Sequence, residues 1–257
     1  MQGGSAPGLK GYFYGIAAVV MTTERNFVVK PGDDDAVRLP GRSIASWFEG
    51  KRGVLMRERS VNGVATRLRI IRVASELFHQ KGIRATSPDR IIEASSTGKG
   101  QFYHYFKSKA GLVHEVLKSH LEVLRDSSDF VNLEISNWQD VEQFYRAFID
   151  LQKKFKMRRG CPIGTIASEV TEEDELIRQD VLLIFELLKN RLAAFFIKEK
   201  ARGKLLPQAD EEGMAEFCIA ALQGALLLGK IQRDSRPVEA ILNEALIHLK
   251  HYIVPAS

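Results

Sequence analysis

Cysteine is scarce in this sequence, because Cys161 and Cys218 are the two among its 257 residues. Two thiols cannot build the disulfide framework of a small secreted protein, and they are too few for a four-cysteine zinc site. We therefore expect a reducing, cytoplasmic environment for the chain. No cluster of histidines, cysteines and carboxylates has metal-ligand spacing either, so the sequence predicts no metal site.

Long hydrophobic runs are also missing, since no window reaches 18 consecutive apolar residues. The longest candidate covers residues 11–21 and contains two glycines, and no small-residue cleavage site follows it. We therefore expect no membrane-spanning helix and no membrane partner. The composition is 45% hydrophobic and 27% charged, which is ordinary for a globular protein and excludes disorder throughout the chain.

Positive charge is concentrated in one stretch of the chain. Residues 57–109 carry 11 Lys/Arg and 4 Asp/Glu, a net charge of +7, whereas residues 110–257 have −4 and residues 1–56 have +2. A small basic unit on a larger acidic one is typical of nucleic-acid-binding proteins, although a solvated basic surface gives the same charge. These three ranges are the domains that we expect.

Residues 1–56 do not have the pattern of a folded domain. Turn-forming residues recur at 2–8, 31–35 and 40–41, and the apolar stretches between them are short. We expect a largely disordered extension. Because Met56 directly precedes the basic unit, the sequence also raises the hypothesis that the natural protein starts there.

From Thr66 onward, hydrophobic residues recur at the spacing of amphipathic helices, and no long stretch alternates with the period of a strand. In the basic unit we expect a helix that ends at Gly82, a second that begins at Ser87, a third over residues 99–106 and a fourth capped by Ser108. The apolar stripe of the first helix consists of Leu68, Ile71, Ala74, Leu77 and Phe78.

The acidic unit repeats the helical period, so the whole chain is expected to be all-α. A three-helix domain with a helix-turn-helix would come first, and a larger helical domain would follow. The helical segments predicted for the larger domain are residues 137–155, a short helix that opens at Pro162, residues 172–202 after a cap at Thr171, residues 210–232 and residues 237–253.

The second and third helices have the proportions of a helix-turn-helix, with a turn of about four residues between them. At about 100° per residue, Phe102, Tyr105 and Phe106 share one face of the third helix, which we expect to pack inward. The other face would be free to meet DNA, although an ordinary helical domain could also have such a mixed surface. The contacts expected there are close backbone approach at Gly100, an adenine edge for Gln101, and phosphates for Tyr103, His104, Lys107 and Lys109.

Residues 66–117 resemble the DNA-binding domain of the TetR/AcrR family of bacterial transcriptional regulators, most specifically in the run KGQFYHYFKSK at residues 99–109. The resemblance implies an all-α homodimer on a palindromic operator in double-stranded DNA. One departure is Gly98, which stands where the family usually has a serine cap, so the aim of Lys99 stays open. The residues implied to contact the DNA backbone are Thr86, Lys99, Gly100, Tyr103, His104 and Lys109, with Gln101 at the groove.

The resemblance also implies that the larger domain senses a small-molecule effector and forms the dimer. The helix at 210–232 has Phe217, Ala221, Gly224, Ala225 and Leu228 on one side, and small residues there would let two helices approach closely. Two helices per subunit could form a four-helix interface, or both stripes could be intramolecular core. The stripe of the final helix consists of Ile241, Ala245, Leu249 and Tyr252.

Aromatic residues recur at helical spacings in the larger domain, and most are expected to be core. A subset could instead line an apolar effector cavity. The candidates for such a lining are Trp138, Phe144, Tyr145, Phe148 and Phe185.

Cys161 is a candidate sensor residue. Pro162 predicts that a helix begins beside it, and Lys156, Arg158 and Arg159 precede it. Both features favour the thiolate, so modification of Cys161 by an electrophile or oxidant could release the protein from DNA. The alternative is that Cys161 only caps a turn. Cys218 lies in an apolar stripe and is expected to be an inert core thiol.

The sequence therefore predicts a DNA-binding transcriptional regulator, in most cases a repressor, that a small molecule or thiol modification releases from its operator. A constitutive DNA-binding protein without an effector is one alternative, and a helical enzyme is another. No nucleophile–base, phosphate-loop or zinc-protease motif occurs, so we expect neither catalysis nor a cofactor. The histidines without an evident partner are His79, His114, His120, His248 and His251.

Overall fold

A computed structural model describes residues 58–126 and 135–255, and within these ranges the chain forms nine α-helices. The expectations for residues 1–56, including a start at Met56, lie outside the described residues. The helices are α3 (Glu58–Lys81), α4 (Pro88–Ala94), α5 (Lys99–Phe106), α6 (Lys109–Asp126), α7 (Trp138–Lys154), α8 (Pro162–Ala167), α9 (Glu175–Ala201), α10 (Glu211–Gln232) and α11 (Arg236–Lys250).

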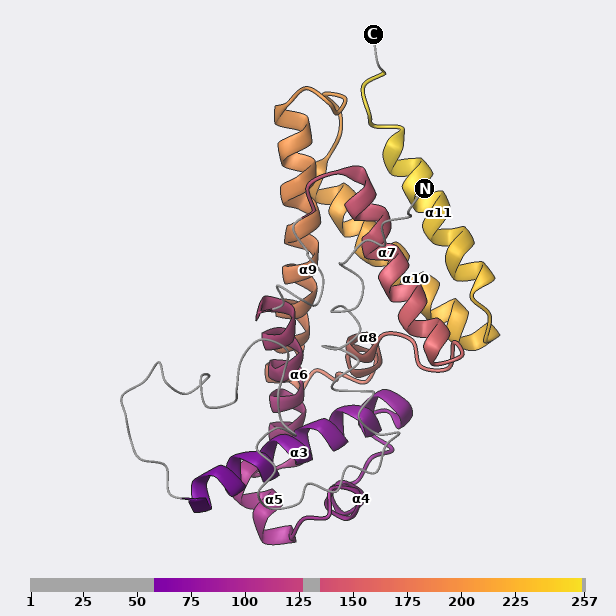
Figure 1. Ribbon diagram of the computed structural model, residues 1–257. Helices are drawn as coiled ribbons and strands as arrows, with labels where there is room; N and C mark the ends of the chain where they lie inside the picture. Colours follow the sequence, from indigo (N-terminus) through magenta and orange to yellow (C-terminus); the bar gives the residue numbers. More distant parts are fainter. Residues whose placement is uncertain (1–57, 127–134, 256–257) are drawn as a thin grey trace, which may run out of the picture.

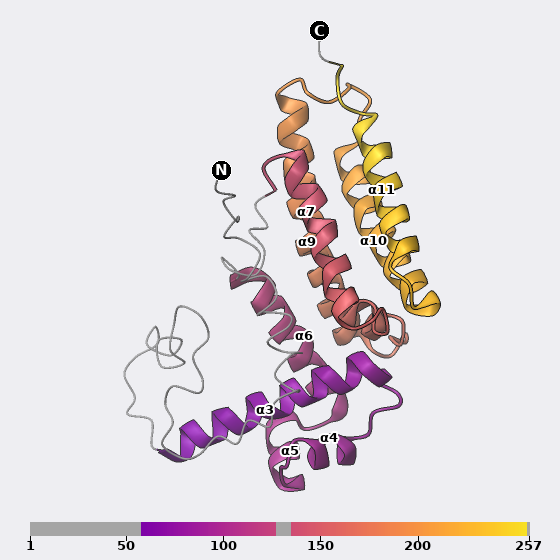
Figure 2. The same cartoon turned by 45° about the vertical axis from the view of Figure 1, so that its right-hand side comes forward.

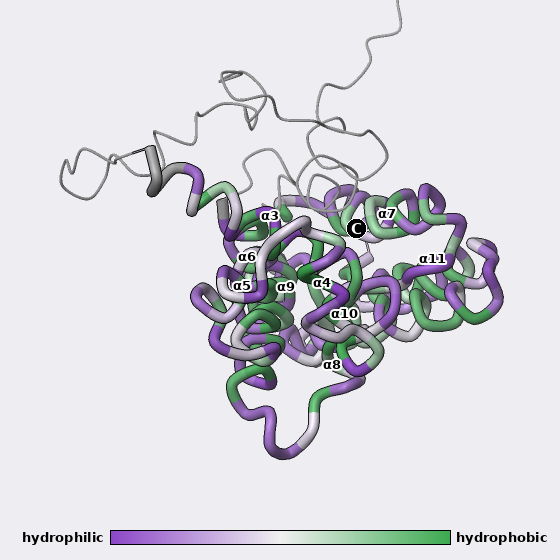
Figure 3. Tube along the Cα trace, turned by 90° about the horizontal axis from the view of Figure 1, so that it is seen from below, coloured by the Kyte–Doolittle hydropathy of each residue, from purple (hydrophilic) through white to green (hydrophobic). Residues whose placement is uncertain are grey.

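The helices form two connected groups (Figure 1). At one end α3 lies across the molecule, with α4 and α5 on its outer side, and α6 leads from this group into the rest of the molecule. The long helices α7, α9, α10 and α11 run alongside one another as a bundle, which Figure 2 shows from a second direction. Figure 3 looks onto the α4–α5 end from below. The all-α class predicted from the sequence is confirmed.

The caps of the first group are those that the sequence predicts. The hydroxyl of Ser87 accepts a hydrogen bond from Arg90 N at 3.3 Å, and Pro88 occupies the first position of α4. The hydroxyl of Ser108 accepts from Gly111 N at 3.0 Å and so caps α6. Gly82 ends α3 with a φ of +82°, a conformation that favours glycine.

The first helix differs from its prediction in two respects. α3 begins at Glu58 rather than at Thr66. Leu68 was expected in the apolar stripe, but 45% of it is exposed, whereas Ile70 is completely buried. The reason is that α4, α5 and α6 cover the face around Ala74, and Leu68 lies on the flank of that face.

Two other helix boundaries were also placed wrongly. α9 begins at Glu175, three residues after the predicted start, because Thr171 donates from its hydroxyl to the carboxylate of Asp174 (2.8 Å) instead of capping a helix. α11 ends at Lys250, and Ile253 beyond it forms an isolated bridge with Leu205. The first deviation arises from a local hydrogen bond, and the second accompanies pairing with a segment distant in sequence; hydrophobic periodicity reports neither.

By length and composition alone, α10 is long and apolar enough to cross a membrane, a test that the core helix of a bundle also passes. Its most apolar window is 39% buried inside the chain, and the helix packs along both α9 and α11. Packing on two sides explains a high apolar content in the central helix of a bundle.

The hydrophobic core runs continuously from the first group into the bundle. Phe78, Ile91 and Phe102 are completely buried where α3, α4 and α5 meet. On α6, the apolar side chains of Leu112, Val116, Leu121 and Leu124 are buried, and the helix packs against both groups. The position of the α4–α5 unit is therefore fixed by packing that it shares with the larger domain.

Candidate nucleic-acid interface

The helix α5 has an aromatic inner face, as the sequence predicts. Phe102 and Phe106 are buried, their ring centroids lie 5.7 Å apart, and Tyr105 is half-buried. Because these rings fix the rotation of the helix, its opposite face points to solvent. The exposed residues on and beside that face are Lys99, Gly100, Gln101, Tyr103, His104 and Lys107.

Gly100 is notable because nothing in the chain requires a glycine at this position. A Cβ built there would meet no atom within 4 Å, and the residue has no positive φ. Glycine inside a helix costs roughly 0.5–1 kcal/mol relative to alanine. This cost is explained if the outer face of α5 must come close to the backbone of another molecule.

Gln101 is engaged with its own helix. Its Oε1 accepts a hydrogen bond from the backbone N–H of Gly98 at 3.1 Å, which is half of a capping box. Gly98 is the N-cap of α5 and has no side chain of its own to cap with, so Gln101 provides the cap. A base contact by Gln101 would require this side chain to leave Gly98.

Lys99 lies beside Asp89 of α4, with Nζ 3.6 Å from Oδ1. The two side chains are 69% and 80% exposed, so solvent screens the pair and it contributes little to stability. The ammonium of Lys99 is thus available to a stronger anionic partner such as a phosphate.

Two of the residues expected to contact DNA instead brace the loop between α3 and α4. Thr86 is completely buried, and its hydroxyl donates to the carbonyl of Gly82 at 2.7 Å. Lys109 donates from Nζ to the carbonyls of Ile83 (2.9 Å) and Thr86 (3.3 Å). Burial excludes the Thr86 side chain from the surface, and we assign both residues to positioning the helix-turn-helix.

A third brace was missed from the sequence. Arg69 on α3 donates from Nε to the carbonyl of Ser95 at 3.0 Å, at the end of α4. An arginine on the flank of an amphipathic helix has no distinctive sequence pattern, so only the fold reveals this contact.

On the far side of α3, Cys161 is the N-cap of α8. Its sulfur accepts a hydrogen bond from Gly164 N at 3.3 Å. Burial raises the pKa of the thiol, although hydrogen bonds from Gly164 and the Gln223 side chain oppose that rise. The expectation that the helix end and nearby cations favour the thiolate is therefore wrong for this conformation. Arg159 is one such cation, and it pairs with Glu76 at 2.6 Å instead.

Four of the five aromatic residues proposed to line an apolar cavity pack in or against the hydrophobic core instead. Phe144, Tyr145 and Phe148 are buried in the bundle core, and Trp138 packs on Phe195, with ring centroids 5.5 Å apart. Phe185 alone among the five aromatics lines the groove that also holds Cys161. The core interpretation of these aromatics is the one that the structure supports.

The groove at Cys161 has a volume of about 560 Å³ and lies between α3, α8 and α10, with Phe185 of α9 also in its lining. The C-terminal end of α3 provides His79 to Gly82, α8 provides Cys161 to Ser168, and α10 provides Gln223 to Lys230. One wall therefore belongs to the same helix that supports α4 and α5.

A buried polar joint connects α3 to the turn before α8. The carbonyl of Gly160 accepts from His79 Nε2 at 2.9 Å and from Gln152 Nε2 at 2.7 Å, and Gly160 N donates to Gln152 Oε1 at 2.9 Å. His120 on α6 lies 3.1 Å from the hydroxyl of Ser75 on α3. Burial lowers the pKa of both histidines to about 4, so both are neutral at pH 7.

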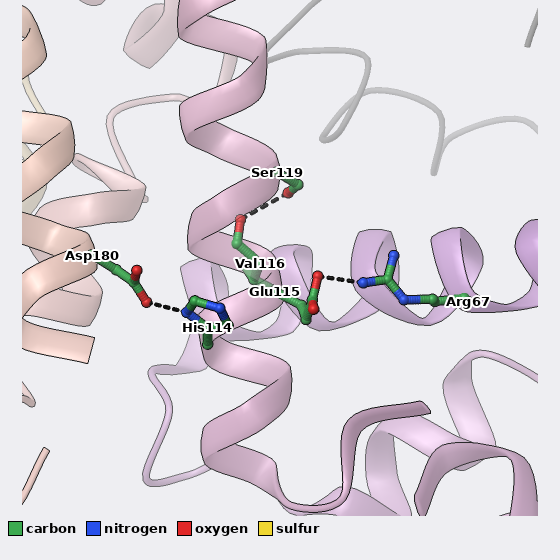
Figure 4. Close-up of polar contacts among 6 residues, drawn as sticks. All are labelled: Arg67, His114, Glu115, Val116, Ser119 and Asp180. Carbon is green, nitrogen blue, oxygen red and sulfur yellow. Dashed lines mark hydrogen bonds and ion pairs between the residues drawn. The ribbon is translucent and has the colours of Figure 1, made fainter. Parts of the chain in front are cut away.

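The helix α6 is tied to both groups by polar contacts (Figure 4). His114 Nδ1 lies 2.6 Å from Asp180 Oδ2 on α9, and Glu115 on the other side pairs with Arg67 on α3. The histidines at 79, 114 and 120, which lack an evident partner in the sequence, therefore each have one in the fold.

α10 has an exposed apolar stripe. Phe217, Gly224 and Leu228 are exposed, as the predicted stripe requires, but Ala225 is buried and Ala221 is half-buried. On α11, Ala245 and Leu249 are buried, which favours the alternative that this stripe is intramolecular core. The packing of α11 on α10 and α7 takes up that side of the helix. The exposed α10 stripe consists of Phe217, Ala220, Gly224, Leu227, Leu228 and Ile231.

Comparisons with known proteins agree with this geometry. A family model described as "Bacterial regulatory proteins, tetR family" matches residues 70–116, and one described as "Tetracyclin repressor-like, C-terminal domain" matches residues 139–245. An uncharacterized HTH-type transcriptional regulator of Lactococcus lactis subsp. lactis is 30% identical over 186 residues, which cover 68% of this chain and 88% of that protein. The HTH-type transcriptional repressor DhaR of Mycobacterium sp. (strain GP1) is 25% identical, over 70% of this chain and 92% of that protein.

Solved structures show the same fold. The reduced form of NemR from E. coli has a TM-score of 0.64 at 22% identity and covers 75% of this chain and 100% of that one. A cysteine mutant of the TetR-family regulator CifR, solved with a 26-base-pair double-strand operator DNA, has a TM-score of 0.59 at 21% identity. It covers 77% of this chain and 98% of that one.

Proposed function

Because this chain belongs to the TetR family of bacterial regulatory proteins, we propose that it is a cytoplasmic repressor that binds a palindromic operator as a homodimer and is released by an effector. The observation that carries the proposal is the outer face of α5. It combines a helix fixed by buried rings, a glycine in open space and a row of exposed donors.

In this proposal α5 lies in the major groove. Tyr103, His104 and Lys107 donate to phosphates on one side, and Lys99 does so from the helix N-terminus, where the helix dipole also favours an anion. Gly100 lets the backbone approach the DNA. Gln101 reads a base edge after it leaves Gly98, and its loss as a cap is then part of the cost of binding.

The α10 stripe would be the surface that joins two copies. Its exposed residues follow one another by three or four positions, which places them along one side of the helix, and Ala220 and Gly224 permit close approach of an identical helix. A two-fold arrangement presents two copies of α5 to successive major grooves, about 34–36 Å apart.

Release would follow from a population shift. An effector that binds better to a conformation with a different spacing of the two α5 helices lowers the population that fits the operator. The joint at Gly160 and the contacts of α6 are the connections through which the larger domain could set that spacing.

The test is a mobility-shift measurement on an operator selected from random-sequence duplexes. The variant Tyr103→Ala/Lys107→Ala should weaken operator binding by about tenfold to a hundredfold, because two phosphate contacts are lost, and should reduce its salt dependence. Lys198→Ala, an exposed change at the end of α9, is the control and should bind as the parent does. Unchanged binding by the folded double variant would refute the proposed interface.

A further inference from the structure

The groove at Cys161 has an excess of positive charge. Three cationic side chains line it, Lys81, Arg159 and Lys230, against one carboxylate, Glu169. Arg159 is paired with Glu76, and Glu169 accepts a hydrogen bond from the backbone N–H of Arg84 at 2.6 Å. Lys81 and Lys230 have no ion-pair partner among residues 58–126 and 135–255.

Lys230 lies close to the thiol end of the groove. A Cβ at Gly160 would be 3.4 Å from Lys230 Cδ, so the lysine chain passes over the residue directly before Cys161. Gln223, two turns earlier on α10, lies over Gly164 and hydrogen-bonds with the thiol. An ammonium, an amide and a thiol therefore line one end of the groove.

The wall from α3 contains a buried polar atom that lacks a partner. His79 is 2% exposed, and because its Nε2 donates to Gly160, its Nδ1 is the unprotonated nitrogen of a neutral ring. No hydrogen bond to Nδ1 occurs within the described part of the chain. Buried nitrogens without a partner are rare in proteins, and an occupant of the groove with a hydrogen-bond donor would supply one.

We propose that this groove is the effector site and that its ligand class is small organic anions. The volume of about 560 Å³ suits a small molecule. Lys230 and Lys81 supply the charge that recognises an anionic group, and the amide of Gln223 can donate to it. The hydroxyls of Thr165 and Ser168 donate to backbone carbonyls, so toward a ligand they act as acceptors. This assignment rests on the proposed function, since an effector site has meaning in a protein that releases DNA.

The position of the groove explains how its occupation reaches the DNA-binding unit. Lys81 and Gly82 end the helix that carries α4 and α5, and the loop braced by Lys109 follows them directly. A ligand held between Lys230 on α10 and this end of α3 links the two groups of helices. Its binding energy can therefore change the angle between them.

Two alkylating probes that differ in charge test the anion preference. In both iodoacetate and iodoacetamide, the Cys161 sulfur attacks the methylene carbon, a C–S bond forms, and iodide leaves with the electron pair of the C–I bond. The thiol proton passes to solvent. The ratio of the iodoacetate rate to the iodoacetamide rate, divided by the same ratio for N-acetylcysteine, isolates the effect of the groove charge. Cys161→Ser measures any background from Cys218.

We expect a normalised ratio of about five or more, because one uncompensated charge near the thiol contributes on the order of 1 kcal/mol. Lys230→Gln should bring it close to one, whereas Lys198→Gln, outside the groove, should leave it unchanged. A ratio near one in the parent protein, or a high ratio that persists in Lys230→Gln, overturns the proposal.

Operator binding by the unmodified protein is measured in parallel. If the operator is bound but the groove shows no anion preference, the effector assignment fails and the proposed function stands. The carboxymethylated protein should bind the operator at least tenfold more weakly than Cys161→Ser treated in the same way. Equal binding by the two proteins overturns the regulatory part of the proposal.

Discussion

At the scale of single residues, a substitution at Gly100 should change the stability of the protein and its binding to DNA in opposite directions. Nothing surrounds it in the chain, so Gly100→Ala should stabilise α5 and raise the free energy of unfolding by roughly 0.5–1 kcal/mol. The added methyl group would stand between the helix and the DNA backbone, so operator binding should fall by about tenfold or more. Thermal unfolding and mobility shifts measure the two effects.

Asn190→Ala is the matched control for Gly100→Ala, because it is an exposed helical position on α9, outside the α4–α5 unit. It should leave operator binding unchanged. If Gly100→Ala also leaves operator binding unchanged, α5 does not approach DNA through this face.

The buried histidines predict how stability depends on pH. His79 and His120 have folded pKa values of about 4, below the ordinary value of about 6.5 that applies when the chain is unfolded. The unfolded chain therefore binds more protons in this range. The free energy of unfolding should be highest above pH 6.5. It should fall as the pH drops toward 4, by about 3 kcal/mol per histidine at most.

Urea unfolding at a series of pH values measures this loss. In His120→Asn, which keeps a polar partner for Ser75, the fall between pH 6.5 and 4 should be smaller than in the parent protein. An identical pH profile in the variant would show that His120 does not titrate on unfolding.

At the scale of secondary-structure elements, the joint between α3, α7 and α8 depends on Gln152. Its amide satisfies both backbone groups of Gly160, whose φ is +73°. Gln152→Leu would leave the N–H of Gly160 without a partner in a buried place, and should lower the free energy of unfolding by about 1–3 kcal/mol. Chemical denaturation measures this loss.

Gln179→Leu on the exposed side of α9 is the control for Gln152→Leu, and its effect should stay within about 0.5 kcal/mol. Equal stability of the two variants would show that the hydrogen bonds between Gln152 and Gly160 contribute nothing to the free energy of unfolding.

At the scale of the whole molecule, the α10 stripe should hold two copies together. Leu228 and Ile231 are 44% and 72% exposed in the single chain. The variant Leu228→Glu/Ile231→Glu should therefore fold into the same subunit structure as the parent protein but sediment as a monomer. Operator binding should fall by at least a hundredfold, because one module then contacts a single half-site. Sedimentation and mobility shifts measure both effects.

Ile197→Glu provides the comparison for this pair, because Ile197 is an equally exposed apolar residue (49%) on α9, outside the stripe. It should remain dimeric. A dimer that survives the double change on α10 places the subunit contact elsewhere on the molecule.

Local signals in the sequence were enough to predict the helices of the DNA-binding unit. The caps at Ser87, Gly98 and Ser108 and the rings at Phe102 and Phe106 act within a few residues of one another, so their spacing is sufficient to place α4, α5 and α6. The same is true of α8, where Cys161 and Pro162 mark the start of the helix. Capping and helical periodicity are short-range effects, and for this reason they can be read from one sequence.

Which side chains are free to contact a partner depends on how distant segments pack together. Thr86 and Lys109 match a DNA-contact motif, yet packing of the α3–α4 loop buries the first and occupies the second. The pKa of Cys161 likewise depends on residues distant in sequence, because burial raises it and the hydrogen bond from Gln223 opposes that rise. Burial, pKa and cavities depend on contacts between remote segments, and hydrophobic spacing does not specify those contacts.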